Sequence, residues 1–116
     1  MSKYRIAIVG QKEAVAGFAL LGIDVMAVND APEAVKELFR LKKMMTTVDG
    51  RERNAYGVVF VSEDLLQGAS ADDHRRLARG ALPAIIPLPS HRGSTGYSTE
   101  RLKRFVERAI GSDILS

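Results

Sequence analysis

The chain has 116 residues, no cysteine and a formal net charge of +3, from 17 basic and 14 acidic side chains. This length predicts one domain, 1–116. The lack of cysteine excludes disulfides, cysteine-ligated metals and a thiol nucleophile. No apolar run approaches the roughly 18 residues of a membrane-spanning helix, and the N-terminus lacks a signal-peptide pattern. We therefore expect a cytoplasmic protein without direct membrane insertion.

Four short apolar runs predict β-strands, at 5–9, 24–28, 56–61 and 84–88. The first and third are apolar without alternation, which is typical of strands buried on both faces of a parallel sheet. The second opens on Asp24, and the fourth is punctuated by Pro83, Pro87 and Pro89. Charge and proline both favour edge positions, so these two runs are predicted to be the edge strands.

Helical patterns separate the strands. A short apolar helix is predicted over 13–21 and ends at Gly22, and a longer helix over 31–45 carries Val35, Leu38, Phe39 and Met45 on its apolar stripe. Asp30 and Glu33 have the spacing of a capping box at the start of this longer helix. A weaker helix begins at 62–64, breaks at Gly68 and resumes over 71–79, and the last helix spans 99–110.

This alternation predicts an α/β fold, a flavodoxin- or receiver-like parallel sheet of four strands in the order 2-1-3-4 with flanking helices. Residues 1–89 would form the body, and 90–116 a hinge loop and C-terminal amphipathic helix. The stretch 46–55 is predicted to be a polar loop with a turn at Asp49-Gly50. Four residues are expected to have structural roles: Gly10, Gly17, Gly22 and Pro87.

The residues that follow the strands do not favour catalysis. A phosphorelay receiver would carry acids after strand one, a phosphoacceptor aspartate ending strand three and a lysine after its last strand. Here the corresponding segments are 10–11, 62–63 and 87–89, which read Gly-Gln, Ser-Glu and Pro-Leu-Pro. Glu63 and Asp64 are interpreted as first-turn helix acids. A degenerate receiver-like interaction or phosphoswitch module remains an alternative.

No cofactor, metal or catalytic residue is predicted. His74 and His91 each lack a nearby second ligand. The segment 93–96, which follows Arg92 and reads Gly-Ser-Thr-Gly, lacks the spacing and lysine of a phosphate loop. Asp72 and Arg76 are interpreted as an i, i+4 ion pair.

Basic side chains gather around His74, Arg75, Arg76 and Arg79, and again at Arg101, Arg104 and Arg108 on the last helix. Nucleic-acid binding would favour such patches interleaved with stacking aromatic residues. The aromatic residues nearby are Tyr97 and Phe105, and Phe105 belongs to the apolar stripe. Solvated faces, or contacts with an acidic protein partner, are therefore favoured, and a small basic RNA-binding protein is a second alternative.

Taken in order, these segments resemble the F subunit of the V-type/A-type rotary ATPase and ATP synthase family. The resemblance is carried by the opening strand 4–10, by 17–23, 58–65, 83–89 and 93–96, and by the final helix with its tail at 113–115. It implies a non-catalytic central-stalk (rotor) component of an ATPase that translocates protons or sodium ions. In this family, such a component binds the D subunit, which is a coiled coil, and its C-terminal helical part can move and touches the catalytic head or the D subunit. It modulates ATP hydrolysis and coupling. The stretch 44–55 is longer than the usual connection in this family.

The last helix is the predicted partner-binding element. It presents an apolar stripe formed by Leu102, Phe105, Val106, Ala109 and Ile110. The expected partner-binding residues are Arg92, Arg101, Leu102, Arg104, Phe105 and Arg108, with hinges at Gly93 and Gly96.

Overall fold

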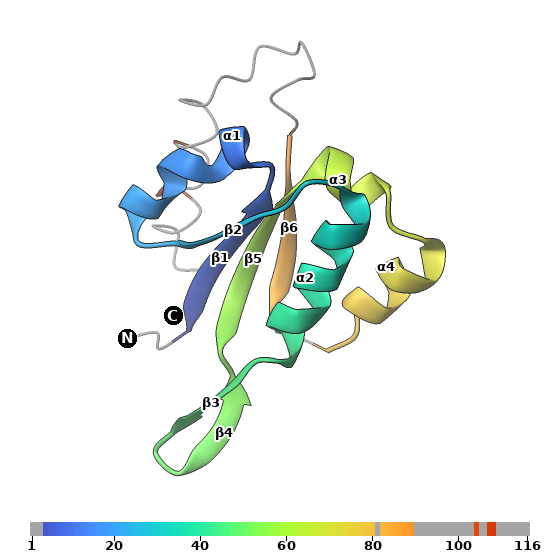
Figure 1. Ribbon diagram of the computed structural model, residues 1–116. Coiled ribbons are helices and arrows are strands. Elements are labelled where there is room, and N and C mark those ends of the chain that lie inside the picture. The colour runs from blue at the N-terminus through green and yellow to red at the C-terminus, as the bar shows by residue number, and fades with distance from the viewer. Residues whose placement is uncertain (1–3, 81, 90–103, 105–106, 109–116) are drawn as a thin grey trace.

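A four-stranded parallel sheet forms the centre of the computed structural model, which describes residues 4–80, 82–89, 104, 107 and 108 (Figure 1). Its strands are β1 (Arg5–Gly10), β2 (Asp24–Ala27), β5 (Tyr56–Ser62) and β6 (Ala84–Leu88). They lie in the order β2-β1-β5-β6. The predicted order 2-1-3-4 is thus confirmed once the two strands of an additional hairpin are counted.

The two central strands are buried on both faces, as the unbroken apolar runs predicted. Ala7 and Val9 contribute to the hydrophobic cluster on one face of β1, and Ile8 contributes to the cluster on the other face. On β5, Val59 belongs to the first of these clusters and Phe60 to the second. This alternation follows from the two-residue period of a strand, so each face needs its own helical cover.

Helices α2 (Ala31–Lys43), α3 (Glu63–Gln67) and α4 (Ala71–Leu77) cover one face (Figure 1). The fully buried side chains of α2 are Ala34, Leu38 and Leu41, so Leu38 alone of the predicted stripe reaches the centre of the core. The predicted end of α2 at residue 45 is wrong, because Met44 has extended backbone with ψ of 127°. The chain therefore leaves the helix before Met45, whose side chain is 51% exposed. The predicted break between the two short helices is confirmed at Gly68.

Helix α1 (Lys12–Val15) and the 3₁₀ helix η1 (Ala16–Leu21) lie on the opposite face. A single α-helix was predicted here, but the segment tightens to 3₁₀ geometry after its first turn. Phe18 nevertheless reaches the core and is 1% exposed. Gly22 ends η1 with φ of +77°, the left-handed conformation expected of a glycine at a helix C-terminus.

The segment predicted as a polar loop is a β-hairpin, β3 (Met45–Val48) and β4 (Arg51–Asn54). Asp49 and Gly50 form its two-residue turn, with φ of +53° and +79°. The prediction of a loop was wrong, because it rested on the polar residues of the segment and not on its strand-forming residues. An Asp-Gly turn after the β-branched run Thr-Thr-Val is a strong hairpin pattern, since both turn positions need positive φ.

Candidate interaction surfaces

The carboxyl edge of the parallel sheet is where an α/β protein would bind a ligand. After β2, Asp30 caps α2 by accepting a hydrogen bond at 3.0 Å from the Glu33 N–H. The Glu33 carboxylate reaches back to the N–H of Asn29, also at 3.0 Å, rather than to that of Asp30 as a capping box would. The polar groups at this end of β2 are therefore used in starting a helix.

The described residues at the ends of β1 and β5 also serve the fold. Glu63 and Asp64 lie in the first turn of α3, as predicted. A Cβ on Gly10 would lie 2.7 Å from Val15 Cγ1 and 2.9 Å from Ser62 Oγ, so β1, α1 and β5 meet here without room for a side chain. Among the described residues, no group of three or more histidine or acidic side chains could hold a metal ion.

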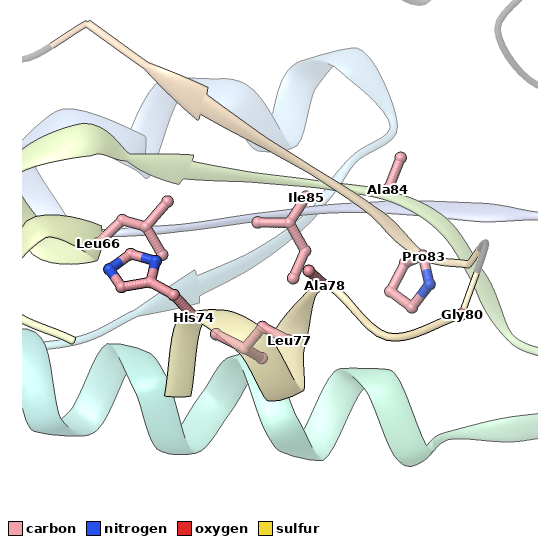
Figure 2. Close-up of a pocket in the computed structure, with 8 residues that line it drawn as sticks. All are labelled: Leu66, His74, Leu77, Ala78, Gly80, Pro83, Ala84 and Ile85. Atoms are coloured by element: carbon pink, nitrogen blue, oxygen red, sulfur yellow. The ribbon is translucent and has the colours of Figure 1, made fainter. Parts of the chain in front are cut away.

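An open cavity of about 250 Å³ lies between α3, α4 and β6 (Figure 2). Figure 2 shows Ile85 pointing from β6 toward α4, whose side chains His74 and Leu77 form the opposite wall. Its other lining residues are Leu66, Ala78, Gly80, Pro83 and Ala84. Among the described lining residues, the imidazole of His74 is the single ionisable group.

Helix α4 carries its charges as local pairs. Arg75 lies 3.2 Å from Asp72, and Arg76 lies 3.9 Å from Asp73. The predicted pairing of Asp72 with Arg76 is wrong, because both acids bind the residue three positions ahead. Exposed pairs of this kind contribute little stability, but they pair two of the three arginines in the basic patch inferred from the sequence.

Helix α4 is fixed to α2 by two further contacts. The guanidinium of Arg76 lies 4.7 Å from the centre of the Phe39 ring, a cation–π contact. The ammonium of Lys42 donates a hydrogen bond to the backbone carbonyl of Arg79, two residues beyond the end of α4. These contacts hold one wall of the cavity against the helix layer.

At the amino edge of the sheet, Tyr56 donates a hydrogen bond to Asp24 at 2.7 Å, and Arg5 forms an ion pair with the same carboxylate. The Arg5 guanidinium also lies 5.1 Å from the Tyr56 ring centre. Burial, and secondly the bond to Asp24, raise the pKa of the Tyr56 phenol. The cluster joins β1, β2 and β5, so its role is structural.

Two of the predicted partner-binding residues, Arg104 and Arg108, are described, and both are helical and exposed. Arg92, Leu102 and the other expected partner and hinge residues, Arg101, Phe105, Gly93 and Gly96, lie outside the described residues. Gly17 lies half-buried within η1, and Pro87 lies on the edge strand β6.

Sequence reasoning missed the cavity and the hairpin. The hairpin had a local signal in its Asp-Gly turn, whereas the cavity had none. Its walls come from segments that are apart in the chain, Leu66, 74–80 and 83–85, and nothing in the apolar pattern tells a filled interface from a hollow one.

The fold and its surfaces define a receiver-like α/β protein whose sheet edge is occupied by helix starts and close packing. The chain belongs to the family of ATP synthase (F/14-kDa) subunits, whose model matches residues 6–106. It is similar to the F subunit of the V-type ATP synthase of Fusobacterium nucleatum, with 35% identity over 97% of this chain and 96% of the relative. The F subunit of the A-type ATP synthase of Thermococcus sibiricus is 31% identical over 95% of this chain and 97% of the relative.

The architecture agrees with a solved structure. The crystal structure of the F subunit of the V-type ATP synthase of Archaeoglobus fulgidus matches with a TM-score of 0.59 and 24% identity, covering 74% of this chain and 98% of that chain. This similarity shows the fold. The described helices include none long and apolar enough to span a membrane.

Proposed function

We propose that this chain is a non-catalytic component of the central stalk of a V/A-type ATPase or ATP synthase, cytoplasmic and peripheral to the membrane. In this role it binds the coiled-coil D subunit and modulates the coupling of ATP hydrolysis or synthesis. The observation that carries the proposal is the family match over residues 6–106, supported by relatives that align over nearly their whole length.

The chemistry of the sheet edge supports a non-catalytic role. Ser62 stands at the end of β5, where a receiver domain would place its phosphoacceptor. Asp30 and Glu33 are used in capping α2. Titration of the purified chain with Mg-ATP is expected to release no heat at tens of micromolar, and acetyl phosphate with magnesium is expected to leave its mass unchanged. Saturable binding or a phosphate adduct would favour the phosphoswitch alternative.

The charge arrangement also favours a protein partner over RNA. On α4, Arg75 and Arg76 are paired with acids of the same helix, which lowers the local positive potential that RNA binding needs. A salt-dependent complex with generic RNA would contradict this interpretation.

Reconstitution tests the proposed function directly. An ATPase complex purified without this chain should take it up in a 1:1 ratio with the coiled-coil D subunit, and uptake should change the rate of ATP hydrolysis. A chain truncated after Gly96 should keep the folded sheet yet fail to restore regulation. If the truncated chain restores the rate fully, the regulatory role of the last helix is wrong; if the full chain does not join the complex, the central-stalk proposal is wrong.

A further inference from the structure

The β3–β4 hairpin extends away from the sheet and its helices (Figure 1). It is held at its base, where the Arg53 guanidinium lies 4.1 Å from the centre of the Tyr4 ring and the Asn54 amide donates to the Lys42 carbonyl at 3.3 Å. The hairpin is a sheet of two strands, so within the described part of the chain the outer edge of each strand has no neighbouring strand.

The turn geometry fixes which backbone groups lie on these edges. A two-residue turn is closed by a hydrogen-bonded pair, here Val48 and Arg51, and hydrogen-bonded and non-bonded pairs then alternate along an antiparallel ladder. The next pair, Thr47 and Glu52, is therefore non-bonded, and its N–H and C=O groups point outward. The Ala55 N–H donates to the Met44 carbonyl at 2.9 Å. Met44 and Ala55 are an even number of pairs away from Val48 and Arg51, so this bond lies where the alternation requires one. Met45 and Thr47 thus present the backbone groups of the β3 edge.

The free strand edges of the described residues differ in how they are protected. Pro87 lies within β6 and cannot donate a hydrogen bond, and prolines flank that strand at 83 and 89. Strand β4 carries three charged side chains, and β2 carries the charged Asp24. Proline and charge are the usual devices that prevent strand addition.

Strand β3 has neither device. Its sequence is Met-Thr-Thr-Val, with three β-branched residues and no charge or proline. Met45 is also one of the two large apolar side chains exposed in the described part of the chain. This edge therefore combines outward backbone groups with side chains that favour a strand.

We propose that the outer edge of β3 accepts an extended segment of a partner polypeptide, which adds to the hairpin as a third strand. The segment is uncharged and rich in β-branched or apolar residues, because its neighbours are Met45 and Thr47 on one face and Thr46 and Val48 on the other. The inference rests on the proposed function, since a neighbouring subunit of the ATPase supplies the segment. Main-chain bonds then give affinity, and the alternating side chains give selectivity.

A second copy of the chain is a weaker occupant. Pairing β3 with the β3 of another copy would join only four residues of each chain. The area that they bury would be far below the roughly 800 Å² per partner of a stable dimer. The edge therefore stays open in the isolated chain.

Amide hydrogen exchange on the unmodified chain, free and bound to an ATPase complex purified without it, tests this assignment. The amides of Met45 and Thr47 should exchange at least about tenfold more slowly in the complex, since strand addition protects outward N–H groups. A chain that joins the complex with unchanged exchange over 45–48 would overturn the strand addition while leaving the proposed function intact. A chain that does not join overturns both, and concentration-dependent protection of the free chain would favour self-pairing instead.

A matched pair of variants supplies the second test. Thr47→Pro removes the outward N–H of β3, and Glu52→Pro removes that of the directly opposed residue on β4, so each leaves the bonds between β3 and β4 unbroken. Thr47→Pro should weaken binding to the complex about tenfold, the factor for one net hydrogen bond, whereas Glu52→Pro should change it less than about twofold. Equal losses, or none, would contradict the assignment to β3.

Discussion

Two glycines of this chain are constrained for opposite reasons. Gly22 has φ of +77° with no atom within 4 Å of where a Cβ would stand, so its constraint is purely conformational. Gly10 has no unusual φ, yet a Cβ there would lie 2.7 Å from Val15. The first constraint was predictable from an apolar helical run that ends in glycine. The second depends on tertiary packing, which sequence spacing does not reveal.

Replacing Gly22 with valine should lower the free energy of unfolding by about 1–2 kcal/mol, because a Cβ disfavours the left-handed conformation. Gly22→Asn is the matched control, since asparagine adopts this conformation more readily and should cost less. Urea melts of the two variants and the unmodified protein measure the difference. A valine variant as stable as the unmodified protein would show that the backbone relaxes out of positive φ.

Tyr56 should make stability depend on alkaline pH. Its pKa is raised above the usual 10.0, so the native chain keeps the phenol proton at pH values where the unfolded chain loses it. The resulting contribution to the free energy of unfolding is fully present below about pH 10 and is lost as pH rises through the native pKa. Tyr56→Phe should lower the free energy of unfolding by about 1 kcal/mol at pH 7, because the hydrogen bond to Asp24 is lost. Above pH 10, the free energy of unfolding of this variant should decline less steeply than that of the unmodified protein. Parallel curves for the two proteins in urea melts from pH 8 to 11 would contradict this.

At the scale of elements, the four strands of the parallel sheet were the most predictable part. Their boundaries follow from short apolar runs, and β6 has the predicted bounds, Ala84–Leu88. Helices were less predictable where local propensity competes with tertiary geometry, as in the change from α1 to η1. The hairpin shows a different failure, in which polar side chains hid a strand pair whose turn, Asp49-Gly50, was itself recognised.

The contact between α2 and α3 depends on Gly68, because a Cβ there would lie 2.3 Å from the Ala31 Cβ. Gly68→Ala should therefore lower the free energy of unfolding by about 1–3 kcal/mol, through overpacking. The double variant Ala31→Gly with Gly68→Ala restores the room and should recover part of the loss. A double-mutant cycle in urea measures the coupling, and additive losses would show that the helices do not meet as described.

At the scale of the whole molecule, apolar patterning was enough to predict the sheet order, because a strand buried on both faces must be central. The surfaces were harder to predict, since the cavity by Ile85 requires α4 and β6 to be placed in space. The resemblance to the F subunit of rotary ATPases supplied the partner class, which no single residue of the sheet edge indicates. What the structure adds is the use of that edge in folding, because Asp30 caps α2 and Gly10 lets β1, α1 and β5 pack closely.

The exposed arginines Arg104 and Arg108 should attract acidic side chains of the stalk partner, in a contact that depends on salt. Replacing both with glutamate should weaken binding to an ATPase complex that lacks this chain by about tenfold at low salt, mainly through slower association. The difference should vanish near 1 M salt, where screening acts within about 3 Å. Lys12→Glu combined with Lys36→Glu, two exposed changes on α1 and α2 that alter the net charge by the same amount, is the control and should have a smaller effect. Titrations at low and high salt measure both variants. Equal losses for the two would indicate long-range steering by net charge, and an unchanged affinity for the arginine variant would remove these arginines from the interface.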